Sequence, residues 1–88
     1  MAWSIEFDEE AIDELARLDR EAQRRIIRYL RERIATDEDP RRFGRPLKGE
    51  LAGLWRYRAG DYRIVCEIQE AAVRVVVVRV GHRRDVYR

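Results

Sequence analysis

The 88-residue sequence predicts an α+β fold with the order β-α-α-β-β-β, in which a helical hairpin packs on a mainly antiparallel four-stranded sheet. Three patterns predict this fold. Apolar residues recur at helical spacing from Ile12 to Ile34, apolar and polar residues alternate through Leu54–Ile68, and a β-branched run fills Val73–Val80. A chain of this length can bury one core, so we expect a single domain over residues 1–88.

The N-terminal part predicts a short strand followed by two helices. Trp3, Ile5 and Phe7 alternate with polar residues, as in a half-buried strand. Asp8 and Asp19 each precede a helical pattern and are suited to cap it, and the short connection between the patterns predicts an αα-hairpin. The expected buried stripes comprise Ile12, Leu15, Ala16 and Leu18 in the first helix, and Ala22, Ile26, Ile27, Leu30 and Ile34 in the second.

The segment between the helices and the later strands is rich in proline and glycine. Residues Thr36–Gly53 show no sustained period, so we expect a loop with room for a short helical turn. A tight turn is expected at Glu70-Ala71. The run Val73–Val80 carries apolar residues on both faces, which predicts a central strand.

The segment Leu54–Ile68 predicts a β-hairpin with three arginines on one face. Alternation places Arg56 and Arg58 on one face of the first strand, and a turn at Ala59-Gly60 would pair Arg56 with Arg63. A shift of two in this register leaves all three arginines on the same face. Like charges facing each other across strands cost about 0.2–1 kcal/mol, so this face is suited to bind an anion.

Charge is divided unevenly along the chain, although its net value is only +2. Residues 1–40 carry twelve acids and seven arginines, a net −5, whereas residues 41–88 carry twelve basic residues and five acids, a net +7. Lys48 is the only lysine, and arginine is the side chain better suited to phosphate. The arginine content is equally consistent with a bias in genome composition. Arg24, Arg28 and Arg31 share one side of the second helix. This side is either a solvated outer face or a secondary contact with RNA or the ribosome.

Several classes of protein are not indicated. The N-terminus has neither a basic segment nor a long apolar run, so we expect no signal peptide, no membrane span and a cytoplasmic location. The single Cys66 lies in an apolar alternation and is expected to be a small core residue. Because the sequence has no Cys/His cluster, no glycine-rich phosphate loop and no metal-binding spacing of acids, we expect no metal and no small-molecule cofactor.

Two blocks of sequence resemble the RelE toxin family of the RelE/ParE superfamily. They are PLKGELAGLWRYRAGDYRIVCEI, which begins at Pro46, and VVVVRVGHRRDVY, which ends at Tyr87. The preceding strand and helical pair agree in length and order, so the resemblance covers essentially the whole chain. It implies a toxin of a type II toxin–antitoxin system, an mRNA interferase that cuts mRNA in the ribosomal A site and is neutralised by a RelB-like antitoxin.

The resemblance also implies the positions of the active-site residues. The family's basic and aromatic site residues fall here on Arg56, Arg58, Arg63, Arg83 and Tyr87. His82 fills a neighbouring position, basic in the family, in the segment GHRRDVYR (residues 81–88), which we call the C-terminal tail. Well-studied members carry lysines where this chain has Arg56 and Arg58. Because arginine is effectively always protonated, the identity of the general base stays open.

The chemistry implied is attack of a ribose 2′-OH on the adjacent phosphate, which requires a base, charge stabilisation and an acid. Arg56, Arg58, Arg63 and Arg83 are suited to stabilise the phosphorane. His82 is the only side chain whose ordinary pKa lies near neutrality, which makes it a candidate for proton transfer. Tyr87 is suited to stack on a base or ribose, to donate a proton or, beside arginines, to act as a phenolate. The alternatives are an exposed tail histidine, and a tyrosine that only packs the tail on the sheet.

Three other functions compete with this interpretation. A ParE-like toxin has the same general fold but blocks DNA gyrase by binding, a nucleic-acid-binding module would bind RNA without cutting it, and a degenerate toxin would have lost catalysis. An antitoxin is expected to pair with an exposed sheet edge or to lay an amphipathic helix on an apolar surface, with acids facing the arginines.

Overall fold

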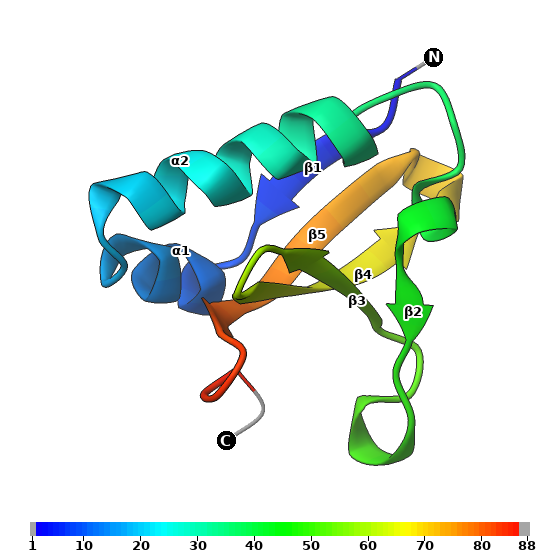
Figure 1. The fold of residues 1–88 in the computed structure, drawn as a ribbon. Helices are drawn as coiled ribbons and strands as arrows, with labels where there is room; N and C mark the ends of the chain where they lie inside the picture. The colour runs from blue at the N-terminus through cyan, green and yellow to red at the C-terminus, as the bar shows by residue number, and fades with distance from the viewer. Residues whose placement is uncertain (1, 87–88) are drawn as a thin grey trace.

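The computed structural model describes residues 2–86, which form two helices on one face of a five-stranded sheet (Figure 1). The helices are α1 (Glu9–Ala16) and α2 (Arg20–Tyr29), and one π-helical turn, Leu30–Ile34, continues α2. The strands are β1 (Ser4–Phe7), β2 (Arg45–Pro46), β3 (Trp55–Ala59), β4 (Tyr62–Gln69) and β5 (Arg74–His82). Short 3₁₀ turns cover Pro40–Phe43, Gly49–Leu51 and Glu70–Ala72. The predicted α+β class is confirmed.

The sheet has one strand more than the four predicted. Its order is β1-β5-β4-β3-β2, with β1 parallel to β5 and the other neighbours antiparallel. The extra strand, β2, lies in the segment expected to be loop, where Arg45 pairs with Arg56 and Pro46 with Trp55. Two residues, one of them a proline, show no alternation that could reveal a strand.

The predicted helices and their caps are confirmed, with one difference in α1 and one at the end of α2. In α1, Ile12 and Ala16 are exposed although both were expected in the buried stripe, and Ala11 is the residue that is buried. Asp8 Oδ1 accepts a hydrogen bond from the Ala11 N–H at 2.9 Å, and Asp19 Oδ1 accepts one from the Ala22 N–H at 2.8 Å. The regular part of α2 stops at Tyr29, whereas the apolar spacing had extended the helix to Ile34. Leu30 and Ile34 are buried within the π-helical turn, so the apolar stripe continues where the helix type changes.

The hairpin turn lies one residue later than predicted. Gly60 and Asp61 form the turn, so Arg58 pairs with Arg63 and Arg56 with Val65. Gly60 has a φ of +63°, which a type II′ hairpin turn requires at its first central position. The register therefore shifts by two from the predicted pairing, and the prediction that Arg56, Arg58 and Arg63 share one face is confirmed.

The last strand also differs from its predicted limits. It begins at Arg74 and runs to His82, while Val73 has a φ of +50° at the end of the 3₁₀ turn that replaces the expected tight turn. A β-branched residue in this left-handed region is strained. A bulge interrupts the pairing of β4 with β5, since Val65 pairs with Arg79 and the next residue, Cys66, pairs with Val77.

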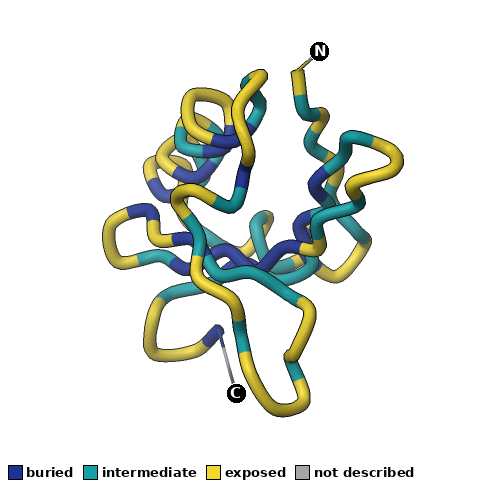
Figure 2. The backbone as a smooth tube through the Cα atoms, turned by 90° about the vertical axis from the view of Figure 1, so that its right-hand side faces the viewer, coloured by how far each residue is buried: buried dark blue, intermediate teal, exposed yellow. Residues whose placement is uncertain are grey.

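The core lies between the helices and the sheet, where Figure 2 shows the buried segments. Tyr57 is completely buried, and its hydroxyl donates to the Pro40 carbonyl at 2.8 Å. The centroid of its ring lies 6.3 Å from the centroid of the Tyr29 ring. A Cβ at Gly44 would lie 3.0 Å from the nearest atom of the Tyr57 ring. Tyr57 thereby joins the sheet to the loop that precedes β2. The core cluster comprises Ala11, Ile26, Leu30, Ile34, Tyr57, Ala59, Ile64, Cys66, Val75, Val77 and Val80.

A carboxylate from α1 completes the exposed edge of β5. The pairing of β1 with β5 ends at Phe7 and Val77, and no described strand pairs with the edge of β5 beyond that point. The Glu14 carboxylate lies where a neighbouring strand would be. Its Oε1 accepts a hydrogen bond from the Val80 N–H at 2.9 Å, and its Oε2 accepts one from the Nε of Arg79 at 3.0 Å. This contact fixes α1 against the end of β5, from which the C-terminal tail departs.

Burial of Cys66 predicts a loss of stability at alkaline pH. Burial raises the pKa of the Cys66 thiol, and desolvation likewise raises the pKa of Tyr57. The folded state keeps these protons while the unfolded chain releases them, so the stabilisation is complete below the ordinary thiol pKa of about 8.5 and declines as pH rises above it. We expect the urea midpoint to fall between pH 8 and pH 10, and to fall less in Cys66→Ala. Parallel pH profiles for the two proteins would contradict this.

None of the helices within residues 2–86 has the length and apolar character needed to cross a membrane.

Candidate functional site

Four arginines lie on the sheet face opposite the helices, and we call them the arginine face: Arg45, Arg56, Arg58 and Arg63. Directly paired residues of antiparallel strands point to the same face, and Arg45 pairs with Arg56 while Arg58 pairs with Arg63. Tyr57 and Ile64, which alternate with these arginines, are buried on the helix side. The arginine face therefore spans β2, β3 and β4.

Arg45 was not among the site residues expected from the sequence. It precedes a proline in a segment without periodicity, and only the pairing of β2 with β3 places it beside Arg56. The short run GRP between the two loops gave no strand signal that could have identified it.

Two members of the arginine face, Arg56 and Arg58, carry positive charge that ion pairs do not neutralise in the part of the chain that the structure describes. The Nε of Arg56 is buried and has no hydrogen-bond partner in this part of the chain. A bound anion would relieve the repulsion between these arginines. The buried, unpaired N–H group of Arg56 costs about 1–3 kcal/mol as long as the side chain keeps this position.

Arg63 is held more firmly than the other three arginines. Only 9% of its surface is exposed, and its Nη1 donates to the carbonyls of Gly60 and Tyr62 at 3.1 and 3.2 Å. These bonds fix the guanidinium next to the hairpin turn, where it lies opposite Arg58. A preorganised donor of this kind needs little reorganisation when charge develops on a substrate.

The C-terminal tail folds back toward Arg63. The backbone N–H of Arg83 donates to the Asp61 carbonyl at 2.8 Å, and the Val86 N–H donates to the His82 carbonyl at 3.1 Å. Val86 is buried and lies against Gly81, whose register partner is Arg63. The side chain of Arg83 is exposed and forms no ion pair within residues 2–86. The tail thus places Arg83 near the turn beside the arginine face.

His82 lies on the other side of the sheet. Gly81 pairs with Arg63, so the next residue, His82, faces the helix side with its partner Tyr62. The two rings meet edge to face, with centroids 5.8 Å apart, and the Arg84 N–H donates to His82 Nδ1 at 3.3 Å. The structure therefore does not bring the His82 ring together with the arginine face. Tyr87, the other predicted proton-transfer residue, lies outside the described residues.

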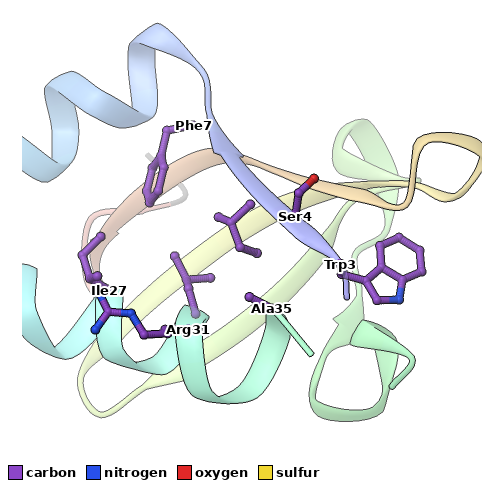
Figure 3. A pocket seen from close by; sticks show the side chains of 8 residues that line it. Trp3, Ser4, Phe7, Ile27, Arg31 and Ala35 are labelled. Atoms are coloured by element: carbon purple, nitrogen blue, oxygen red, sulfur yellow. The ribbon is translucent and has the colours of Figure 1, made fainter. Parts of the chain in front are cut away.

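An apolar groove lies between β1 and α2, on the far side of the molecule from β3 (Figure 3). Its volume is about 280 Å³, and β1 beside it is an edge strand whose outer side has no strand partner within residues 2–86. Figure 3 shows Phe7 on the strand, with Ile27 and Arg31 on the helical side. The groove is lined by Trp3, Ser4, Ile5, Phe7, Ile27, Leu30, Arg31 and Ala35.

The arginine face is chemically suited to bind phosphate and to stabilise negative charge. Guanidinium groups form strong, directional bonds to phosphate oxygens, and the arginine face concentrates four of them. Among residues 2–86, no group of three or more His, Cys, Asp or Glu side chains is placed to hold a metal ion.

Sequence comparison finds curated relatives in Mycobacterium tuberculosis. Toxin RelG is 46% identical over 50 residues, which are 57% of this chain and 58% of RelG. Toxin RelE of the same organism is 40% identical over 50 residues, which are 57% of this chain and 52% of that toxin. The matched segment thus spans little more than half the length of these relatives.

Structural comparison extends the similarity to almost the whole chain. The crystal structure of the M. tuberculosis toxin–antitoxin complex RelBE2 contains a chain that matches with a TM-score of 0.86 and 29% identity, covering 97% of this chain and 95% of that one. The family model described as the ParE toxin of the type II toxin–antitoxin system parDE matches residues 5–87. This chain therefore belongs to the ParE toxin family of type II toxin–antitoxin systems, within the RelE/ParE superfamily.

Proposed function

We propose that this protein is a ribosome-dependent mRNA endoribonuclease that cuts mRNA in the A site without a metal ion. The observation that carries the proposal is the arginine face, where Arg58 lies opposite Arg63 and Arg56 keeps a buried, unpaired N–H group. The relatives named RelE and RelG support it. Ribosomes and mRNA are cytoplasmic, and so is the proposed site of action.

The proposed reaction is attack of a ribose 2′-oxygen on the adjacent phosphorus. A bond forms between the 2′-oxygen and phosphorus, the bond to the 5′-oxygen breaks, and the products are a 2′,3′-cyclic phosphate and a 5′-OH. The 2′-OH loses its proton to a base, and the 5′-oxygen gains one from an acid. Arg56, Arg58, Arg63 and Arg83 bind the scissile phosphate and stabilise the charge that develops on its oxygens.

Proton transfer is assigned to Tyr87 in preference to His82. His82 faces the helix side of the sheet, away from the arginine face, so we expect His82→Gln to change the single-turnover cleavage rate less than threefold. Tyr87→Phe should lower that rate by about 10²–10⁴-fold, the usual contribution of general acid–base catalysis. Rates measured on mRNA-programmed ribosomes across pH test this. A large loss in His82→Gln with full activity in Tyr87→Phe would reverse the assignment.

A second candidate function is inhibition of DNA gyrase, because the matching family model is described as a ParE toxin. Two assays on the purified protein separate the candidates. Mapping of mRNA ends on programmed ribosomes should show cuts in phase with codons, and a DNA supercoiling assay should show no inhibition of gyrase. The opposite pair of results would establish the ParE-like function.

We also propose that a RelB-like antitoxin neutralises the protein by binding the groove beside β1. The similar M. tuberculosis chain was crystallised in a toxin–antitoxin complex. The groove combines an open strand edge, an apolar lining and the positive charge of Arg31, which suits an amphipathic segment carrying acids.

Ile27→Asp is expected to separate antitoxin binding from cleavage. A carboxylate in the apolar groove should weaken the antitoxin at least tenfold, because it removes an apolar contact, must lose its water when the antitoxin binds and competes with the antitoxin's acids for Arg31, while mRNA cleavage is retained. Ile12→Asp is the matched control, since Ile12 is 52% exposed and lies on α1 outside the groove. Titration calorimetry with the antitoxin measures both variants. Equal affinities would place the antitoxin elsewhere.

A further inference from the structure

A second group of arginines surrounds a pocket between α2 and the β3–β4 turn. The pocket has a volume of about 220 Å³, and we call it the helix-side pocket. Its charged lining residues are Arg25, Arg28, Arg33, Arg58 and Glu32, so four positive charges and one negative charge leave a net +3. It lies on the opposite side of α2 from the apolar groove, which Ile27 and Arg31 line.

Ion pairs within residues 2–86 do not neutralise the charge of the helix-side pocket. None of the ion pairs formed among residues 2–86 involves Arg25, Arg28, Arg33 or Arg58, and Glu32 also remains outside them. The guanidinium of Arg33 lies 5.2 Å from the centre of the Phe43 ring, so a cation–π contact orients it without cancelling its charge. Four cations held in one concavity favour an anionic ligand.

The hairpin turn forms the floor beneath Arg25. Gly60 has a φ of +63°, and a Cβ at this position would collide with the Arg25 guanidinium. Any side chain at residue 60 would therefore displace that group as well as strain the turn. The same glycine that sets the hairpin register leaves the space in which Arg25 lies.

Arg58 joins this pocket to the arginine face. The short strand β2 pairs with Trp55 and Arg56, and no strand among residues 2–86 covers the edge of β3 at Arg58. Arg58 lies opposite Arg63 in the sheet and also lines the helix-side pocket. A polyanion bound on the arginine face can therefore pass around the edge of β3 and stay in contact with arginines along the way.

We propose that the helix-side pocket binds a second phosphate of the RNA strand whose scissile phosphate lies on the arginine face. The ligand is the sugar–phosphate backbone of single-stranded RNA, one or more nucleotides away from the cleaved bond. This inference rests on the proposed nuclease function and adds a subsite to it. Because the contact is the same before and during the reaction, it lowers KM and leaves kcat unchanged.

The test compares two doubly substituted proteins with wild type. Arg25→Gln/Arg28→Gln removes two charges from the pocket, and Arg17→Gln/Arg20→Gln removes two exposed charges that line none of the pockets described. Fluorescence anisotropy at several salt concentrations measures affinity for a single-stranded RNA made uncleavable by 2′-O-methyl groups. Steady-state kinetics on programmed ribosomes supply KM and kcat. Circular dichroism checks that each variant is folded. We expect the fold to be preserved, because glutamine and arginine have similar helix propensities.

The pocket variant should bind RNA about tenfold more weakly, with a salt dependence reduced by about 0.7 in log–log slope, the value for one phosphate contact on a single strand. Its KM should rise while kcat stays constant, and the control should match wild type. An equal loss in both variants, or none in either, would overturn the proposal. So would unchanged RNA affinity with weakened antitoxin binding, which would assign the pocket to an acidic peptide. If wild type cuts no mRNA, the proposed function fails, but the RNA affinities still decide whether the pocket binds phosphate.

Discussion

Arg56→Ala is expected to lower the single-turnover rate of mRNA cleavage by about 10²–10³-fold, the usual effect of removing one preorganised donor from a developing oxyanion. Arg56 lies at the centre of the arginine face, between Arg45 on β2 and Val65 on β4, and its Nε is buried without a partner. A donor in this state gives up no protein hydrogen bond when phosphate binds. Rapid-quench measurement on programmed ribosomes provides the rate.

Two further variants show whether the effect of Arg56→Ala is chemical. Arg56→Lys keeps the charge but loses the planar fork, so it should recover part of the rate. Arg17→Ala removes an exposed arginine at the end of α1 and should behave as wild type. A loss in Arg17→Ala as large as in Arg56→Ala would show that total charge matters and that the arginine face has no special role.

Tyr57→Ala is expected to reduce the free energy of unfolding by about 3–5 kcal/mol, as for other large aromatic side chains removed from a core. Tyr57 is completely buried, contacts the Tyr29 ring, and donates its hydroxyl to the Pro40 carbonyl. Its loss would leave a cavity between sheet and helices and an unpaired carbonyl in the loop. Urea denaturation followed by circular dichroism measures the change.

Tyr57→Phe isolates the hydrogen bond from the packing. It keeps the ring and removes the donor to Pro40, so it should cost about 1–3 kcal/mol, the penalty for an unsatisfied buried acceptor. Tyr57 alternates with Arg56 and Arg58 on β3, so a loosened core face should also disorder the arginine face and slow cleavage in Tyr57→Ala. Wild-type stability in Tyr57→Ala would contradict the structural role.

The arginine face shows how much of a site local pattern can predict. Residues two apart on a strand share a face whatever their partners are, so Arg56 and Arg58 could be placed together from the sequence. The predicted hairpin register was wrong by two residues. Because a shift of two leaves every side chain on its face, Arg63 still lies on the same face as Arg56 and Arg58. A register error of one would have placed Arg63 in the core.

The C-terminal tail shows where local pattern fails. The last strand is apolar on both faces, so alternation does not reveal which residues face the core. The bulge between β4 and β5 then shifts their pairing by one residue, so simple alternation from the start of β5 does not give the face of the residues at its end. His82 consequently lies on the helix side with Tyr62, although it is adjacent in sequence to Arg83.

Local sequence was enough to predict the α+β class, both helix caps and the common face of three hairpin arginines, because each depends on residues that are neighbours along the chain. Tertiary structure alone decided the fifth strand with Arg45, the position of His82, and the meeting of Arg58 with the arginines of α2. These features depend on pairing between distant segments and on one bulge, which no local period encodes.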